Sequence, residues 1–255
     1  MPSKQRHFTH NFRLELTYDG TLYSGWQIQP HSRSIQQVIQ DAIKTVVKEE
    51  VTLIGSGRTD AGVHALGQVA HFKTAKPLSC DSLFRSINGI LPKDIRLKSI
   101  EEAPLDFHAQ MSAKAKIYHY HIVLDPIVSP FIRLYVYHHP RPLDRALFEK
   151  AAHKFVGTHN FTSFANSASE GSAAKNPIRT IYRLDVIPTE HGLRCEFEGN
   201  GFLYKMVRNI VGTLVEVAKG RIPLSHIDHL FKVKDRRQTP KSVPAQGLFL
   251  VRVIY

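Results

Sequence analysis

The order of its hydrophobic patterns is the feature that most constrains how this chain folds. Residues 11–18 alternate apolar and polar side chains, which is the spacing of a strand with one buried face. Residues 35–46 instead repeat apolar side chains at helical spacing, and Ser34 with Gln37 three positions later is typical of a helix start. The same reasoning predicts strands at 51–54, 68–73 and 95–100 and a helix at 81–90.

A similar series follows in the second half of the chain. Asp144 is a suitable cap for a helix over 144–156, and Gly220 is a suitable C-terminal cap for a strongly apolar helix over 202–219. The small polar residues 163–176 are typical of a loop. Strands are expected at 116–124, 178–187, 192–198 and 248–255.

These patterns predict an α+β protein with two halves of similar size. Glu101-Glu102-Ala103-Pro104 interrupts the pattern, so we expect an N-terminal domain at residues 1–106 and a C-terminal domain at 107–255. Strands that alternate apolar and polar residues favour antiparallel sheets with helices on one face. The other face of such a sheet is free to meet a partner.

Charge gives the first indication of that partner. The chain has 34 Lys and Arg against 22 Asp and Glu, a net charge of +12, and a basic protein of this kind attracts nucleic acid. No apolar run approaches the roughly 18 residues of a membrane helix, and residues 1–10 lack the apolar core of a secretion signal. Two cysteines cannot form a disulfide framework, so we expect a cytoplasmic protein with no membrane partner.

The glycine-rich segment 55–64 (GSGRTDAGVH) is the clearest candidate for chemistry. Its spacing fits neither phosphate-binding pattern, because Val63-His64 follow Gly62 where a Walker loop needs Lys, and Asp60 replaces the third glycine of a dinucleotide loop. Two interpretations remain: a tight turn in which Asp60 caps a local amide, or a loop that presents Asp60 as a nucleophile or base.

Several blocks, in this order, resemble the tRNA pseudouridine synthase A family. The resemblance extends from about residue 11 to residue 255, and its Arg-Thr-Asp-Ala-Gly-Val-His core is highly specific. The blocks are 18–27 (YDGTLYSGWQ), 57–64 (GRTDAGVH), 91–95 (LPKDI), 107–109 (FHA), 115–120 (AKIYHY), 201–212 (GFLYKMVRNIVG) and 245–248 (AQGL).

The resemblance implies both a fold and a reaction. The implied fold is two RNA-recognition-like α+β domains whose antiparallel sheets join into one extended sheet, with helices on one face. The implied reaction converts uridine to pseudouridine at positions 38, 39 and 40 in the anticodon stem-loop of tRNA. A homodimer with a basic cleft is also implied, with no metal and no organic cofactor.

The resemblance assigns Asp60, Tyr118 and Arg208 to the site, and Arg58 is a fourth candidate because it lies two residues from Asp60. Asp60 is the implied catalytic carboxylate, which adds to the sugar or to the uracil ring or helps to remove a sugar proton. Arg58 binds phosphate or shapes the loop. Tyr118 stacks on the base or helps to remove the C5 proton. Arg208 pairs with Asp60 and keeps the carboxylate ionised, which fits a charge placed among apolar helix residues.

Further basic residues are candidates for contacts with RNA phosphates. They are Arg58, Lys73, Lys114, Lys116 and the run from Lys232 to Lys241. The chain departs from the family pattern at Gln110-Met111, where members commonly have Arg-Phe, and at 165–171 (ANSASEG), where Arg and Cys are usual. The first departure predicts a missing or displaced RNA contact, and the second bears on the breadth of substrates.

Two other functions are compatible with parts of the sequence. A non-catalytic RNA-binding protein would show the same charge and the same fold pattern, but the intact blocks around Asp60, Tyr118 and Arg208 argue against it. A metal-dependent hydrolase is suggested by His119, His121 and the pair His138-His139, although no HExxH motif or Cys/His array is present.

Overall fold

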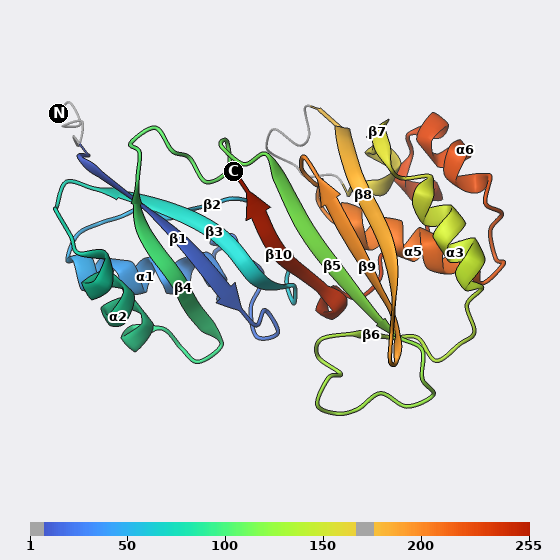
Figure 1. Cartoon of the computed structure of the whole chain (residues 1–255), viewed down its shortest axis with the longest axis horizontal. Helices are drawn as coiled ribbons and strands as arrows, with labels where there is room; N and C mark the ends of the chain where they lie inside the picture. The colour runs from blue at the N-terminus through green and yellow to red at the C-terminus, as the bar shows by residue number, and fades with distance from the viewer. Residues whose placement is uncertain (1–7, 167–175) are drawn as a thin grey trace. The chain divides into compact units, whose positions relative to one another are not determined.

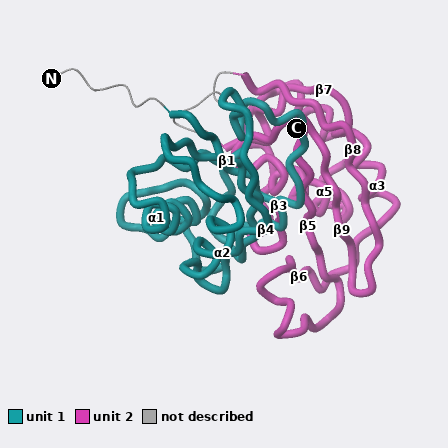
Figure 2. The backbone as a smooth tube through the Cα atoms, turned by 60° about the vertical axis from the view of Figure 1, so that its left-hand side comes forward, with its two compact units in different colours: residues 1–114, 250–255 teal, residues 115–249 magenta. Residues whose placement is uncertain are grey.

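The computed structural model describes residues 8–166 and 176–255 and divides the chain into two compact units. Unit 1 comprises residues 1–114 and 250–255, and unit 2 comprises residues 115–249 (Figure 2). The first division falls after residue 114, whereas the expected boundary lay between residues 106 and 107. The last six residues belong to unit 1, so this unit is not a continuous stretch of chain.

Unit 1 is a mostly antiparallel sheet with two helices (Figure 1). Its strands run in the order β4-β1-β3-β10, and β2 pairs with β3. The elements are β1 (His10–Tyr18), α1 (Ile35–Val47), β2 (Ile54–Gly55), β3 (His64–Thr74), α2 (Cys80–Ile90), β4 (Ile95–Ala103) and the unit 1 part of β10 (Leu248–Ile254).

The alternation predicted for the first strand sets the two faces of this sheet. Phe12, Leu14 and Leu16 are fully buried, whereas Arg13 and Glu15 point to the opposite face. The predicted helix start is also confirmed, because the Oγ of Ser34 accepts a hydrogen bond from the backbone N–H of Gln37. The apolar face of α1 is buried behind the strands.

Unit 2 is a second sheet, in the order β5-β9-β8-β7, with three antiparallel pairings. The short β6 pairs in parallel with β5. The strands and α-helices are β5 (Ala115–Val123), β6 (Tyr137–His138), α3 (Arg145–His153), β7 (Gly157–Asn160), β8 (Ile178–Thr189), β9 (Gly192–Gly199), α5 (Met206–Ala218) and α6 (His226–Val233). The 3₁₀ turns are η1 (Thr162–Phe164), η2 (Arg236–Gln238) and η3 (Ala245–Gly247).

The apolar helix expected at 202–219 begins later than predicted. Lys205 has a φ of 60°, in the left-handed region, so regular helix starts only at Met206. The other predicted helix caps are confirmed: Asp144 accepts from the backbone N–H of Leu147 at 2.9 Å, and Gly220 has a φ of 68°. The predicted loop 163–176 lies largely outside the described residues, and α6 was not predicted.

The α+β fold class is confirmed by these antiparallel strands and the helices packed beside them. No helix within residues 8–166 and 176–255 combines the length and the hydropathy that crossing a membrane requires.

Two helical glycines provide a test of the packing of α5. A Cβ at Gly212 on α5 would lie 2.4 Å from the carbonyl oxygen of Lys241, whereas a Cβ at Gly89 on α2 would meet nothing within 4 Å. We expect Gly212→Ala to lower the free energy of unfolding by about 1–3 kcal/mol through overpacking. Gly89→Ala should raise it by about 0.5–1 kcal/mol through helix propensity. Urea unfolding measures both, and a stabilised Gly212→Ala would contradict this packing.

Candidate active site

Asp60 lies in the loop that joins β2 to β3 in unit 1. The start of this loop is bound to β3 by both backbone and side chain. The backbone N–H of Ser56 donates to the carbonyl oxygen of Val69 at 2.7 Å, and its hydroxyl donates to Oε1 of Gln68 at 2.7 Å. The Nε2 of Gln68 donates to the carbonyl oxygen of Gly57 at 3.0 Å. The loop therefore leaves the sheet in one fixed direction.

The residue before Asp60 is held from two sides by the segment 18–27. The hydroxyls of Tyr18 and Thr59 are 2.8 Å apart and buried, and the backbone N–H of Trp26 donates to the carbonyl oxygen of Thr59 at 3.0 Å. Burial raises the pKa of Tyr18 to about 12, so its phenol keeps its proton at neutral pH. Both the side chain and the backbone of Thr59 are thus fixed directly beside Asp60.

Gly25 lets that segment approach the Asp60 loop. Its φ of +91° lies in the left-handed region, and a Cβ there would lie 2.6 Å from the carbonyl oxygen of Thr59 and 3.0 Å from the carbonyl carbon of Asp60. The backbone N–H of Val63 closes the turn by donating to the carbonyl oxygen of Asp60 at 3.1 Å. The tight turn of the first interpretation is therefore present as a backbone feature.

The two candidate residues of this loop differ in exposure. Asp60 is half-buried and Arg58 is exposed. A half-buried carboxylate on a fixed turn can reach a substrate while its own position is maintained. The exposed guanidinium of Arg58 is accessible to solvent and to a charged ligand. The roles predicted for both residues stay predictions.

Tyr118 lies on β5 in unit 2, where its side chain is 7% exposed. Its ring meets the edge of the Phe202 ring, with 5.1 Å between centroids, and Phe202 in turn lies 6.4 Å from Phe197. Phe197 is the residue paired with Tyr118 across β5 and β9. This aromatic cluster fixes the plane of the Tyr118 ring, as a stacking role for that ring requires.

Arg208 lies in the first turn of α5, in the same unit. Its Nε donates to the carbonyl oxygen of Val243 at 2.9 Å, and the backbone N–H of Val243 donates to the carbonyl oxygen of Arg208 at 3.3 Å. The neighbouring Pro244 accepts from the hydroxyl of Tyr120 at 2.8 Å. Burial raises the pKa of Tyr120 well above 10, and the positive charge of Arg208 opposes that rise.

The structure thus groups the four predicted residues in two pairs. Arg58 and Asp60 share one loop of unit 1, whereas Tyr118 and Arg208 belong to unit 2. Tyr118 lies on the same face of β5 as Tyr120, and the positive charge of Arg208 acts on the pKa of Tyr120. The supporting residues Tyr18, Thr59 and Phe202 lie in the blocks of the resemblance, but the sequence assigned them no role. Gln68 lies outside those blocks, and nothing in the sequence marked it.

The basic candidates differ in what they contact. Lys114 and most of the cations between Lys232 and Lys241 are exposed, and Lys73 and Lys116 are half-buried. Arg236 differs from these, because its guanidinium donates to Oδ1 of Asn209 at 2.9 Å and to the carbonyl oxygen of Thr239 at 2.8 Å. Arg236 therefore joins η2 to α5 and to the residue after η2. These internal hydrogen bonds make it a poor candidate for binding RNA.

The two departures from the family pattern fall in different places. Gln110 and Met111 are exposed on the segment after β4. The departure at 165–171 lies mostly outside the described residues.

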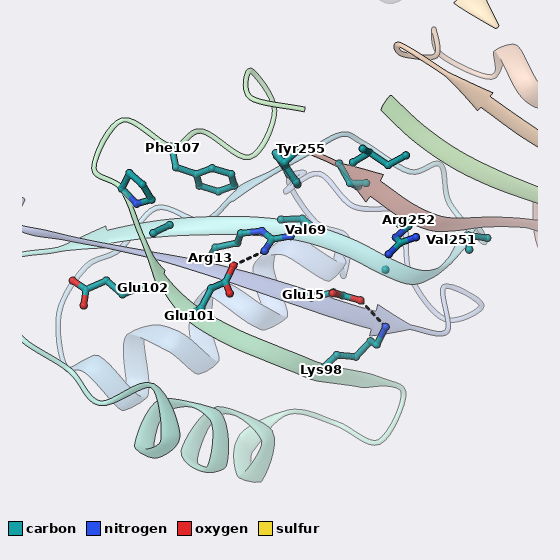
Figure 3. Close-up of a pocket in the computed structure, with 15 residues that line it drawn as sticks. Arg13, Glu15, Val69, Lys98, Glu101, Glu102, Phe107, Val251, Arg252 and Tyr255 are labelled. Atoms are coloured by element: carbon teal, nitrogen blue, oxygen red, sulfur yellow. Dashed lines mark hydrogen bonds and ion pairs between the residues drawn. The ribbon is translucent and has the colours of Figure 1, made fainter. Parts of the chain in front are cut away.

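A separate groove of about 940 Å³ lies on the polar face of the unit 1 sheet (Figure 3). Four of its charged residues form two ion pairs: Arg13 with Glu101, and Lys98 with Glu15 at 2.6 Å. Neither Arg58 nor Asp60 lines it. The groove is therefore distinct from the Asp60 loop.

Of the histidines that suggested a metal site, His119 and His121 share one face of β5, whereas His139 is buried. Burial lowers the pKa of His121 to about 4, and His119 lies 3.7 Å from Glu196. Residues 8–166 and 176–255 contain no group of three or more His, Cys, Asp or Glu side chains placed to hold a metal ion.

Comparison with known proteins finds relatives along nearly the whole chain. The sequence model of a family described as tRNA pseudouridine synthase matches residues 16–111 and 151–255. The tRNA pseudouridine synthase A 1 of Protochlamydia amoebophila is 55% identical over 96% of this chain and 96% of its own length. The tRNA pseudouridine synthases A of a Geobacillus species and of Limosilactobacillus reuteri are 43% and 42% identical, over 95% and 96% of this chain and 97% of each relative.

The matched residues include the Asp60 loop, the segment that supports it and the helix that carries Arg208. Several relatives named tRNA pseudouridine synthase A or A 1 are thus identical to this chain at this level over nearly the whole length of both proteins. The chain therefore belongs to the tRNA pseudouridine synthase A family.

Proposed function

We propose that this chain isomerises uridine to pseudouridine at positions 38, 39 and 40 in the anticodon stem-loop of tRNA, with Asp60 as the catalytic carboxylate. The observation that carries the proposal is the construction of the Asp60 loop. A half-buried carboxylate stands beside Thr59, and both the hydroxyl and the carbonyl oxygen of Thr59 are bound by the segment 18–27. Such fixation is what a group that must meet a reacting atom requires.

The reaction needs no oxidant and no reductant. The bond between N1 of uracil and C1′ of ribose breaks, the base turns, and a bond forms between C5 and C1′. C5 loses its proton and N1 gains one, so atoms and electrons balance within the nucleotide. The chemistry therefore requires a nucleophile or base that starts bond cleavage, a group that assists removal of the C5 proton, and a site that retains the detached base.

Asp60 supplies the carboxylate in this proposal. Three routes are open to it: attack on the sugar at C1′, addition to the uracil ring, or help in removing a sugar proton. Each route requires the ionised form. We propose that Arg208 pairs with Asp60 and keeps it ionised, while the hydrogen bond from Nε of Arg208 to Val243 orients the guanidinium.

Tyr118 and Arg58 act on the substrate in this proposal. The ring of Tyr118 stacks on the target base or helps to remove the C5 proton, and its edge contact with Phe202 sets the plane in which it meets the base. Arg58 is exposed and binds phosphate. Because a paired or stacked uridine is out of reach, the base must be extruded before it meets these groups.

A homodimer in the cytoplasm completes the proposal. The resemblance to the family supports the dimer, and a tRNA substrate supports the cytoplasm. Light scattering of the purified chain at micromolar concentration should give twice the mass of 28.9 kDa. A mass equal to one chain at the concentration used for activity would refute the dimer.

The reaction itself can be followed with tRNA labelled with ³H at C5 of uridine. Since isomerisation replaces the C5–H bond, we expect the wild type to release tritium without added cofactor and in the presence of EDTA. Asp60→Ala and Asp60→Asn should lower the rate at least about 10³-fold, because the carboxylate is needed for bond cleavage. Bound tRNA without release by the wild type would instead favour the non-catalytic RNA-binding protein.

Arg208→Ala should reduce turnover more than affinity. Loss of the guanidinium leaves Asp60 without its proposed ion-pair partner, so we expect kcat to fall about 10²-fold or more while the tRNA Kd changes by less than about three-fold. Arg208→Lys keeps the charge but loses the Nε–H group that binds Val243, so it should recover part of the activity. Equal losses in kcat and in affinity would contradict a role at Asp60.

A further inference from the structure

A second group of charged residues lies beside Tyr118 in unit 2. Lys116 precedes Tyr118 by two positions on β5, so both side chains leave the same face of the strand, roughly 7 Å apart. A single nucleotide spans such a separation. Across the sheet, Lys116 pairs with Gly199, at the start of the turn 199–202 that brings Phe202 against Tyr118.

The turn 199–202 also meets Arg179. A Cβ on Gly201 would lie 3.5 Å from Nε of this arginine, and a Cβ on Gly199 would lie 2.7 Å from the carbonyl oxygen of Thr180. Gly199 is thus needed for the close approach of β8. Because Gly201 has no side chain, no side-chain atom of this residue lies against the neighbouring guanidinium of Arg179.

The contacts of Arg179 orient it without neutralising it. Among the described residues, its Nη1 donates to the carbonyl oxygens of Asn176 at 2.8 Å and Ile178 at 2.6 Å. These acceptors are neutral, so the guanidinium keeps its full positive charge. Two hydrogen bonds to the backbone fix the direction of the remaining N–H groups.

Arg179 and Lys116 act on each other electrostatically. Burial and, to a smaller extent, the positive charge of Arg179 together lower the pKa of Lys116 to about 8. A pKa of about 8 still leaves most of the lysine protonated at neutral pH. Two cations in a half-buried setting repel each other, and a bound anion would relieve that repulsion.

We infer that Lys116 and Arg179 together bind the RNA phosphate adjacent to the target uridine, whose base lies against Tyr118. This inference rests on the proposed function and specifies how the substrate is positioned there. The RNA backbone supplies an anion within one nucleotide of the extruded base, which matches the spacing of Lys116 and Tyr118 along β5. The two cations contribute binding and placement, and they take no part in bond making.

The test compares charge-neutral variants with matched controls in the same unit. Lys116→Gln, Arg179→Gln and the double variant remove the proposed contacts. Lys150→Gln and Arg145→Gln remove the same charges from exposed positions on α3. We expect each variant of the pair to weaken tRNA binding about ten-fold or more, as for hydrogen bonds to a charged group. The controls should change binding by less than about two-fold.

Salt dependence shows whether both cations meet one phosphate. The slope of log Kd against log salt should fall by about 0.7–0.9 when one phosphate contact is lost. If Lys116 and Arg179 bind the same phosphate, the salt slope of the double variant should fall by about the amount expected for one phosphate contact. The fold-increase in Kd of the double variant should also be smaller than the product of the fold-increases of the two single variants. Slopes equal to those of the controls would overturn the inference.

A modified RNA locates the phosphate. A neutral methylphosphonate placed next to the target uridine should weaken binding by the wild type about ten-fold and leave the double variant unchanged. Equal effects on both proteins would overturn the assignment. Lys116→Arg should retain binding, and thermal unfolding of each variant identifies any that fails to fold.

These measurements separate the two proposals. If the wild type binds tRNA but releases no tritium, the proposed reaction fails, while the salt slopes and methylphosphonate effects still decide the role of the cations. If the wild type releases tritium normally and the variants of Lys116 and Arg179 bind like the controls, the phosphate site fails and the proposed reaction stands.

Discussion

The buried hydrogen bond between Tyr18 and Thr59 is the interaction on which the position of Asp60 depends. It joins the end of β1 to the loop between β2 and β3, and the hydrogen bond from Trp26 to the carbonyl of Thr59 reinforces it. A buried hydroxyl without a partner costs about 1–3 kcal/mol. The loop therefore resists any displacement that would separate the two hydroxyls, and Asp60 is constrained with its neighbour.

Unit 2 fixes its residues by different means. Tyr118 is set by aromatic packing against Phe202, and Arg208 by a hydrogen bond to the segment that follows η2. The close approach of α5 to this segment depends on Gly212, where a Cβ would collide with the carbonyl oxygen of Lys241. Filling the core with apolar side chains is thus not sufficient to build this site, because the backbone of α5 must also meet the backbone of this segment at a defined distance.

Positive charge is used in three ways in this protein. Exposed cations such as Arg58 and Lys114 are available to a polyanion, whereas Arg236 is committed to internal hydrogen bonds. Lys116 and Arg179 are half-buried beside the aromatic cluster of Tyr118. A net charge of +12 therefore favours a polyanionic partner such as nucleic acid but does not tell which cations meet it.

The sequence by itself determined the family, the α+β class and the elements with a clear period, because hydrophobic spacing and caps such as Ser34 act locally. It placed the start of the α5 helix too early, since apolar spacing continues through Lys205 although its backbone is left-handed. Only the tertiary structure decided that Gln68 fixes the Asp60 loop and that residues 250–255 complete unit 1. Those contacts join residues distant along the chain, and no local pattern encodes which distant partner a side chain meets.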